Sequence, residues 1–144
     1  MFGLLGSRPF DDGQLGRLER KGGYWRSSVT LGAHQGVPLL VAGGAKAPSA
    51  DLLVMARSAS AWWDESRSAL QAALFEHYEP YGEEVAVTLT APESVWAHLQ
   101  PVHVLAERGV LEIGLQTDWD EEHTLGALLR DGRLIELNGS VPGA

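Results

Sequence analysis

Apolar and polar residues alternate along the first third of the chain. In YWRSSVTLG, Trp25, Ser27, Val29 and Leu31 fall on one face of an extended strand, and the residues between them fall on the other. QLGRLER precedes this segment, and the glycines of KGG between them favour a hairpin turn. GVPLLVAGG follows as a third strand, in which Pro38 belongs near the start or at an edge because it cannot donate a ladder hydrogen bond.

The middle of the chain has a helical period. Apolar and small residues recur three and four positions apart through ADLLVMARSASAWWDESRSALQAALFEHYEPY, which predicts an inward stripe of Leu52, Met55, Ala59, Trp63, Ser66, Leu70, Ala73, Leu74 and His77. We expect one long helix that ends at Pro80 and that can split at RSASAW, where Ser58 or Ser60 could cap a second piece. Neighbouring helical residues point about 100° apart, so one of Trp62 and Trp63 should be central in the core and the other at its boundary.

A second, shorter helix is expected in TAPESVWAHLQP. Thr90 and Glu93 have the spacing of a capping box, and Pro92 suits the first helical turn, where its missing N–H is harmless. For residues 84–90, which precede it, a strand and a loop remain equally open.

The last third returns to strand patterns. VHVLAERGVLEIGLQTDW predicts two strands around ERG, and TLGALLRDGRLIELNG predicts two around Asp131–Gly132, a dipeptide typical of tight hairpin turns. Leu111, Ile113, Leu115 and Trp119 fall on one face, so Trp119 should be buried. Glu112, Gln116 and Asp118 fall on the opposite face.

These elements predict an α+β fold. We expect an antiparallel sheet of N-terminal and C-terminal strands, with the long helix and the short helix on one face. No internal repeat or linker interrupts residues 1–144, which predicts a single domain.

Charge is distributed unevenly along the chain. Residues 1–50 carry a formal charge of +3 and residues 51–144 carry −11, which gives the net charge of −8. An acidic surface repels phosphate backbones, so we expect no nucleic-acid partner; it would suit a basic protein partner or a cation. Acidic surface also serves simply to keep a small protein soluble.

The chain has no cysteine, which excludes disulfides, thiol nucleophiles and thiolate metal sites. MFGLLGSRPFDDG lacks the charge placement and apolar length of a signal peptide, and no apolar run approaches a membrane span. We therefore expect a cytoplasmic protein that binds no membrane and no cofactor.

The segment QTDWDEEH is the densest group of candidate ligands. Asp118, Asp120, Glu122 and His123 could hold a divalent cation through carboxylate oxygens and an imidazole. Their spacing matches neither the calcium-loop nor the zinc-helix pattern. If the strand continues to Trp119, Asp118 and Asp120 share one face and Glu121 and Glu122 form the turn. In that case the segment is a structural acidic turn in which Asp120 or Glu122 orients His123, or a surface for a partner formed by Asp118, Asp120, Glu121 and Glu122.

The run DWDEEHTLGALLRDGRLIELNGSV resembles the C-terminal signature of small bacterial domains of unknown function. In that signature, a Trp-Asp-x-Glu-His segment precedes a strand, an Asp-Gly turn and a final strand. Trp119, Asp120, Glu122, His123, Gly126 and Asp131–Gly132 occupy the matching positions. The resemblance implies no activity. Some similar acidic domains occur among toxin-immunity proteins, which implies protein binding.

Three hypotheses about function follow. The leading hypothesis is a protein-binding module with an acidic surface, such as a toxin-neutralising immunity protein. The second is a metal-dependent hydrolase centred on Asp118, Asp120, Glu122 and His123, although the absence of G-x-S-x-G and H-E-x-x-H leaves an enzyme without a supporting motif. The third is a structural or oligomerising module, and the sequence does not define an oligomeric state.

Overall fold

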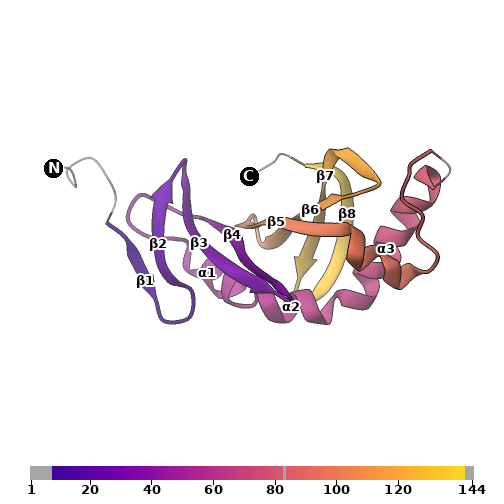
Figure 1. Ribbon diagram of the computed structural model, residues 1–144. Coiled ribbons are helices and arrows are strands. Elements are labelled where there is room, and N and C mark those ends of the chain that lie inside the picture. The colour runs from indigo at the N-terminus through magenta and orange to yellow at the C-terminus, as the bar shows by residue number, and fades with distance from the viewer. Residues whose placement is uncertain (1–7, 83, 142–144) are drawn as a thin grey trace.

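A single eight-stranded sheet forms the frame of the protein. The computed structural model describes residues 8–82 and 84–141. Most of MFGLLGSRPFDDG, the segment that lacks the features of a signal peptide, lies outside this range. The strands are arranged in the sheet in the same order as in the sequence, from β1 to β8. Helices pack on one face of the sheet, with α1 against β4, β5 and β6, α2 against β3, and α3 against β8 at the end opposite β1 (Figure 1). The predicted α+β class is confirmed.

The first four strands form an antiparallel meander. They are β1 (Phe10–Asp12), β2 (Gly16–Lys21), β3 (Tyr24–Leu31) and β4 (His34–Ala42). The hairpin predicted at KGG is present, and both of its glycines have the positive φ that this turn requires. β1 was not predicted, because three residues are too few to show an alternating pattern.

The central helical region is split twice. It comprises α1 (Ala50–Arg57), α2 (Ala59–Glu65), α3 (Arg67–Tyr78) and a short 3₁₀ segment, η2 (Glu79–Tyr81). The predicted split within RSASAW is confirmed, and of the two serines Ser58 rather than Ser60 lies at it, whereas the sequence did not predict the second split at Ser66. Ser58 lies at the N-cap position of α2, as predicted, but its side chain makes no capping hydrogen bond.

The inward stripe of the helices differs from the prediction in its first turns. Leu53 and Ala56 are buried, whereas the predicted Leu52 and Met55 are half-buried. From Ala59 onward the predicted stripe holds for Trp63, Ser66, Leu70 and Leu74. The error arose because Leu52–Leu53 and Val54–Met55 offer apolar side chains on adjacent faces, so spacing alone did not define the register.

The segment between the helices and the next strand contains no strand among its described residues. Residues 84–90 form a loop, and the Tyr78 hydroxyl fixes it by accepting from the Leu89 N–H (3.0 Å) and donating to the Val87 carbonyl (3.3 Å). The predicted short helix is a 3₁₀ helix, η3 (Pro92–His98). The predicted capping box is wrong: Ala91, in an extended conformation, is the N-cap, and no side chain caps this helix.

The last four strands form a second antiparallel meander, which confirms the two predicted C-terminal hairpins. They are β5 (Leu99–Glu107), β6 (Val110–Thr117), β7 (Asp120–Arg130) and β8 (Arg133–Val141). Asp131 and Gly132 form the last turn with φ values of 52° and 75°, as the Asp-Gly dipeptide predicts.

The sheet as a whole is mixed, which corrects the predicted antiparallel sheet. β4 and β5 pair in parallel, with Leu39 opposite Val104 and Val41 opposite Ala106. The chain crosses the helical face between these strands instead of reversing at a hairpin, so both strands run in the same direction. Pro38 lies just before the part of β4 that pairs with β5, where its missing donor costs no bond to that strand.

One hydrophobic core lies between the sheet and the helices. Its largest buried side chains are Trp25 of β3, Trp63 of α2 and Trp119 of the β6–β7 turn. The predicted burial of Trp119 is confirmed, as is the division between buried Trp63 and half-buried Trp62. No helix in the described part of the chain is long and apolar enough to cross a membrane.

Candidate functional site: the acidic turn between β6 and β7

The segment Asp118–His123 turns earlier than the sequence predicts. β6 ends at Thr117, which pairs directly with Asp120 at the start of β7, so Asp118 and Trp119 alone form the turn. Residues paired across two antiparallel strands point to the same face, so Asp120 shares the inward face of Thr117. The prediction that Asp118 and Asp120 share a face, with Glu121 and Glu122 in the turn, is therefore wrong.

Asp120 is an interior carboxylate with fixed partners. Its side chain is 5% exposed, and its Oδ1 lies 2.9 Å from His123 Nδ1. Its Oδ2 accepts a long hydrogen bond from the Tyr81 hydroxyl (3.4 Å). The backbone N–H of Asp120 donates to Thr117 Oγ1 (3.2 Å). The prediction that Asp120 or Glu122 orients His123 is confirmed for Asp120.

Behind Asp120, Trp119 is tied to α3 through His77. The indole Nε1–H donates to His77 Nδ1 (3.0 Å), which must be unprotonated to accept, so the ring proton is on Nε2. Nε2 faces Asp120 Oδ2 at 3.9 Å, too far for a hydrogen bond. Burial lowers the pKa of His77, and the nearby Asp120 carboxylate only partly opposes that effect. His77 is therefore a neutral acceptor that holds the turn against the helix.

On the outer side of the turn, Asp118 is exposed but held in place. Its carboxylate Oδ2 lies 2.9 Å from His98 Nδ1, and its backbone N–H donates to the His98 carbonyl at 2.9 Å. Its side chain nevertheless remains 58% exposed. Two contacts with one residue at the end of η3 thus fix the orientation of a carboxylate that faces solvent.

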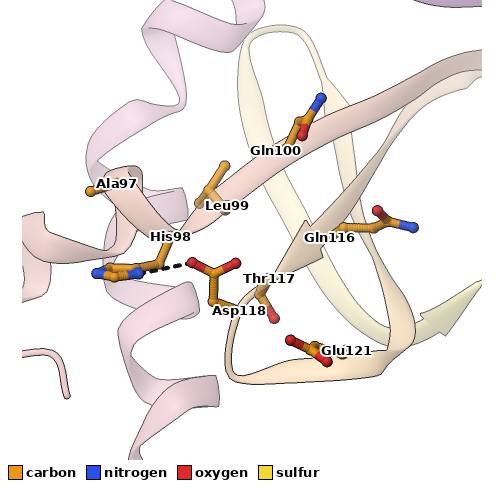
Figure 2. A pocket seen from close by; sticks show the side chains of 8 residues that line it. All are labelled: Ala97, His98, Leu99, Gln100, Gln116, Thr117, Asp118 and Glu121. Carbon is orange, nitrogen blue, oxygen red and sulfur yellow. Dashed lines mark hydrogen bonds and ion pairs between the residues drawn. The ribbon is translucent and has the colours of Figure 1, made fainter. Parts of the chain in front are cut away.

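Two cavities flank the turn. The first, of about 400 Å³, lies between the end of η3, β5 and β6, and Asp118 and Glu121 line it with Gln100 and Gln116 (Figure 2). The second, of about 620 Å³, lies between the turn and the loop after α3, and it combines an apolar wall that includes Val85 and Val87 with Glu122 and His123. Asp118 of the turn and Glu121 of β7 line both cavities, so their carboxylates lie where the two cavities adjoin.

The surroundings of the second cavity are electronegative. The pKa of the Tyr81 phenol is raised, first by burial and then by the negative charge of Asp120, with smaller contributions from Glu84 and Glu122. Glu121 and Glu122 are exposed. In the described part of the chain neither forms a hydrogen bond or an ion pair through its side chain. These carboxylates therefore contribute a negative field that no neighbouring cation neutralises.

The predicted metal ligands are brought near one another but do not converge. Asp118 turns outward to His98, whereas Asp120 turns inward to His123 and Tyr81. Among residues 8–82 and 84–141, no three carboxylate or imidazole groups are arranged to hold one metal ion. Of the four candidates, Asp118 thus contacts His98, Asp120 and His123 contact each other, and the Glu122 side chain forms no hydrogen bond or ion pair with a described residue.

The sequence did not reveal the partners of this turn. His77, Tyr81 and His98 lie 20 to 43 residues before the carboxylates that they face, and tertiary packing of α3, η2 and η3 brings them together. No local spacing signals such contacts. Cross-strand pairing of Gln100 with Gln116 could have been deduced only from the register of β5 and β6.

Comparison with other proteins gives a family but no function. No curated protein and no solved structure matches the chain. The expected resemblance to a domain of unknown function is confirmed at that level. A family model described as "Domain of unknown function (DUF6985)" matches residues 14–141, which is most of the chain, and the chain therefore belongs to that family.

Proposed function

We propose that this protein is a cytoplasmic protein-binding module whose acidic surface at the β6–β7 turn docks a basic protein. Asp118, Glu121 and Glu122 define this acidic surface. The observation that carries the proposal is a difference in burial among neighbouring carboxylates. Asp120 is buried and hydrogen-bonded, whereas Asp118, Glu121 and Glu122 are exposed to solvent.

The geometry favours recognition over mere solubility. Carboxylates that serve only solubility can be scattered and mobile. Here Asp118 lies in a two-residue turn that is anchored by Trp119 to α3 and by Asp118 itself to η3, and Glu121 and Glu122 lie just after it at the start of β7. Such anchoring lowers the conformational entropy lost on binding, which is the usual benefit of a preorganised surface.

The acidic surface is tested by neutralising it. Wild-type protein, immobilised and incubated with native cytosol, should retain a basic partner that the variant Asp118→Asn/Glu121→Gln/Glu122→Gln loses. A matched control carries Asp131→Asn, because Asp131 lies in the turn at the other end of β7 and asparagine tolerates its positive φ. Equal retention of the same partner by wild type and the triple variant would exclude this surface.

Within this proposal, the partner class that the resemblance suggests is a toxin that the module neutralises. The genes beside the coding sequence provide the direct test. A neighbouring gene for a large secreted toxin, whose toxicity is suppressed by wild-type protein and not by the triple variant, would support it. If the triple variant suppressed toxicity as well as wild type does, toxin binding would not use the acidic surface.

The metal-dependent hydrolase alternative makes a different prediction. A divalent ion bound only by the folded state would raise the melting temperature of chelated protein by mass action. We expect no such rise with magnesium, calcium, manganese or zinc, because Asp118 and Asp120 belong to separate contact networks and no three groups of the described residues are arranged around one ion. A rise of several degrees with one ion, abolished by Asp120→Asn or His123→Ala, would favour the hydrolase instead.

A further inference from the structure

The lining of the cavity between η3 and the β5–β6 hairpin includes two carboxylates and two carboxamides, whose oxygens can accept hydrogen bonds. Gln100 and Gln116 are directly paired across β5 and β6, and both side chains are exposed. Within the described part of the chain, neither amide forms a side-chain hydrogen bond. Figure 2 shows the side chains of Gln100 on β5 and Gln116 on β6, with the carboxylates of Asp118 in the turn and of Glu121 on β7.

We propose that this cavity receives an arginine side chain of the partner. This inference rests on the proposed function and names the group that is recognised. A guanidinium presents five N–H donors in a planar fork, and it has no acceptor. Two amide oxygens and two carboxylates around one cavity offer acceptors in several directions, which suits a fork better than the compact ammonium of lysine.

Preorganisation supports the assignment. The Asp118 carboxylate is oriented by His98 Nδ1 at 2.9 Å, and the strand pairing fixes the spacing of the two glutamines. Arginine pairs with carboxylates through parallel N–H···O bonds, and this pairing contributes most to affinity when the carboxylate is already held in place. The about 400 Å³ volume accommodates a guanidinium together with its bound water.

Charge complementarity selects the same occupant. Asp118 and Glu121 are the only acidic side chains among the lining residues, and His98 is the only basic one among them. The His98 ring already directs one nitrogen to Asp118. An incoming cation would therefore be attracted by Glu121 and the second oxygen of Asp118, while the neutral amides would distinguish one cation from another.

The test compares two small probes of equal charge, methylguanidinium and methylammonium, at the same ionic strength. Their binding to the whole protein is followed by NMR through the side-chain amide signals of Gln100 and Gln116. We expect methylguanidinium to bind about fivefold more tightly, as one or two additional hydrogen bonds would give. Equal affinities, or shifts confined to other parts of the protein, would overturn the proposal.

A charge-neutral variant separates this inference from general electrostatic attraction. Gln100→Leu/Gln116→Leu keeps both carboxylates and removes the amide acceptors, so it should abolish the preference for methylguanidinium. An unchanged preference would refute a role for the glutamines. If the double variant unfolds, the single variant Gln100→Leu and the more conservative Gln116→Met provide the same comparison.

The two proposals can fail independently. Loss of a basic partner in the Asp118→Asn/Glu121→Gln/Glu122→Gln variant, combined with identical affinities for both probes, would retain the acidic surface and reject the arginine site. A preference for methylguanidinium without any basic partner would retain the arginine site and reject the proposed function.

Discussion

Asp118 and Asp120 are two residues apart and lie in opposite environments. Asp118 is exposed and held by His98, whereas Asp120 is buried beside His123 and Tyr81. Alternation along a continuous strand would place them together, but the turn at Asp118–Trp119 reverses the chain between them. At the scale of single residues, the position of one turn thus determines which carboxylates can meet a partner.

Trp119 should be the most costly residue of the turn to truncate. Its side chain is 2% exposed, and its indole N–H donates to His77. Trp119→Ala should destabilise the protein by about 3–5 kcal/mol, measured by chemical unfolding, because it leaves a large cavity. Trp62→Ala, at a half-buried position, should cost clearly less. A Trp119→Ala variant that melts within a degree or two of wild type would contradict the packing described here.

His77 should make stability depend on pH near neutrality. Because burial lowers its pKa from the ordinary 6.5, the unfolded chain binds this proton more readily than the folded one. The neutral His77 side chain therefore makes its full contribution to the free energy of unfolding above about pH 6.5. This contribution is lost as the pH falls below that value toward the pKa of His77 in the folded protein.

His77→Gln keeps an acceptor for the Trp119 N–H but cannot titrate, so it isolates the contribution of His77. Thermal melts of both proteins from pH 8 to pH 5 should show a smaller loss of stability for the variant. A parallel decline in the two proteins would show that His77 does not carry this dependence.

At the scale of elements, the β1–β2 turn is tied to α1 by one buried carboxylate. Asp12 accepts hydrogen bonds from Arg57 Nε (3.0 Å) and from the backbone N–H groups of Gln14 (3.0 Å) and Leu15 (2.9 Å). The Arg57 hydrogen bond is the main reason that the pKa of Asp12 falls from 3.8 to about 2, with burial opposing it.

Because its folded pKa is depressed, Asp12 contributes stability above about pH 4, and this contribution is lost as the pH falls toward 2. Asp12→Asn should therefore destabilise the protein at pH 7 by more than it does at pH 2.5. The matched control is Asp11→Asn, whose exposed pair with Arg17 at 3.8 Å should contribute little. Equal effects of the two variants at pH 7 would contradict the role of Asp12.

The pairing of β5 with β6 depends on a glycine in β6 at the position where β5 carries a large side chain. Gly114 pairs with His103, and a Cβ built on Gly114 would lie 2.2 Å from His103 Cε1. Gly114→Ala should therefore destabilise the sheet by about 1–3 kcal/mol or more, since the buried His103 ring cannot move freely.

Gly13→Ala provides the control, because nothing lies within 4 Å of its added Cβ. His103→Ala combined with Gly114→Ala should recover part of the loss in a double-mutant cycle. If Gly114→Ala has the same stability as Gly13→Ala, the close packing of the ring against this strand is not rigid.

At the scale of the whole molecule, periodicity predicted the elements better than their arrangement. The alternation around Trp25 and the Asp131–Gly132 dipeptide identified strands and turns because their causes are local. The parallel pairing of β4 with β5 depends on the path of the helical crossover, which no local pattern encodes. For the same reason, the sequence indicated the acidic segment but not its contacts with His77, Tyr81 and His98.

The charge of the whole chain also bears on function. Residues 51–144 carry −11, and Asp118 of the anchored turn together with Glu121 and Glu122 of β7 places part of that charge beside two cavities. A basic partner would be steered toward this region by a field that salt screens beyond about 8 Å at physiological ionic strength. The proposed docking therefore predicts an association rate that depends on salt, in addition to a binding surface.

The most direct test of docking is the association rate constant of the captured partner, measured from low to high salt for wild type and Asp118→Asn/Glu121→Gln/Glu122→Gln. We predict that the wild-type rate constant falls steeply with salt, because steering acts on association. The triple variant should associate slowly and show a much flatter dependence. A rate constant that is independent of salt and equal in both proteins would contradict electrostatic docking at the β6–β7 turn.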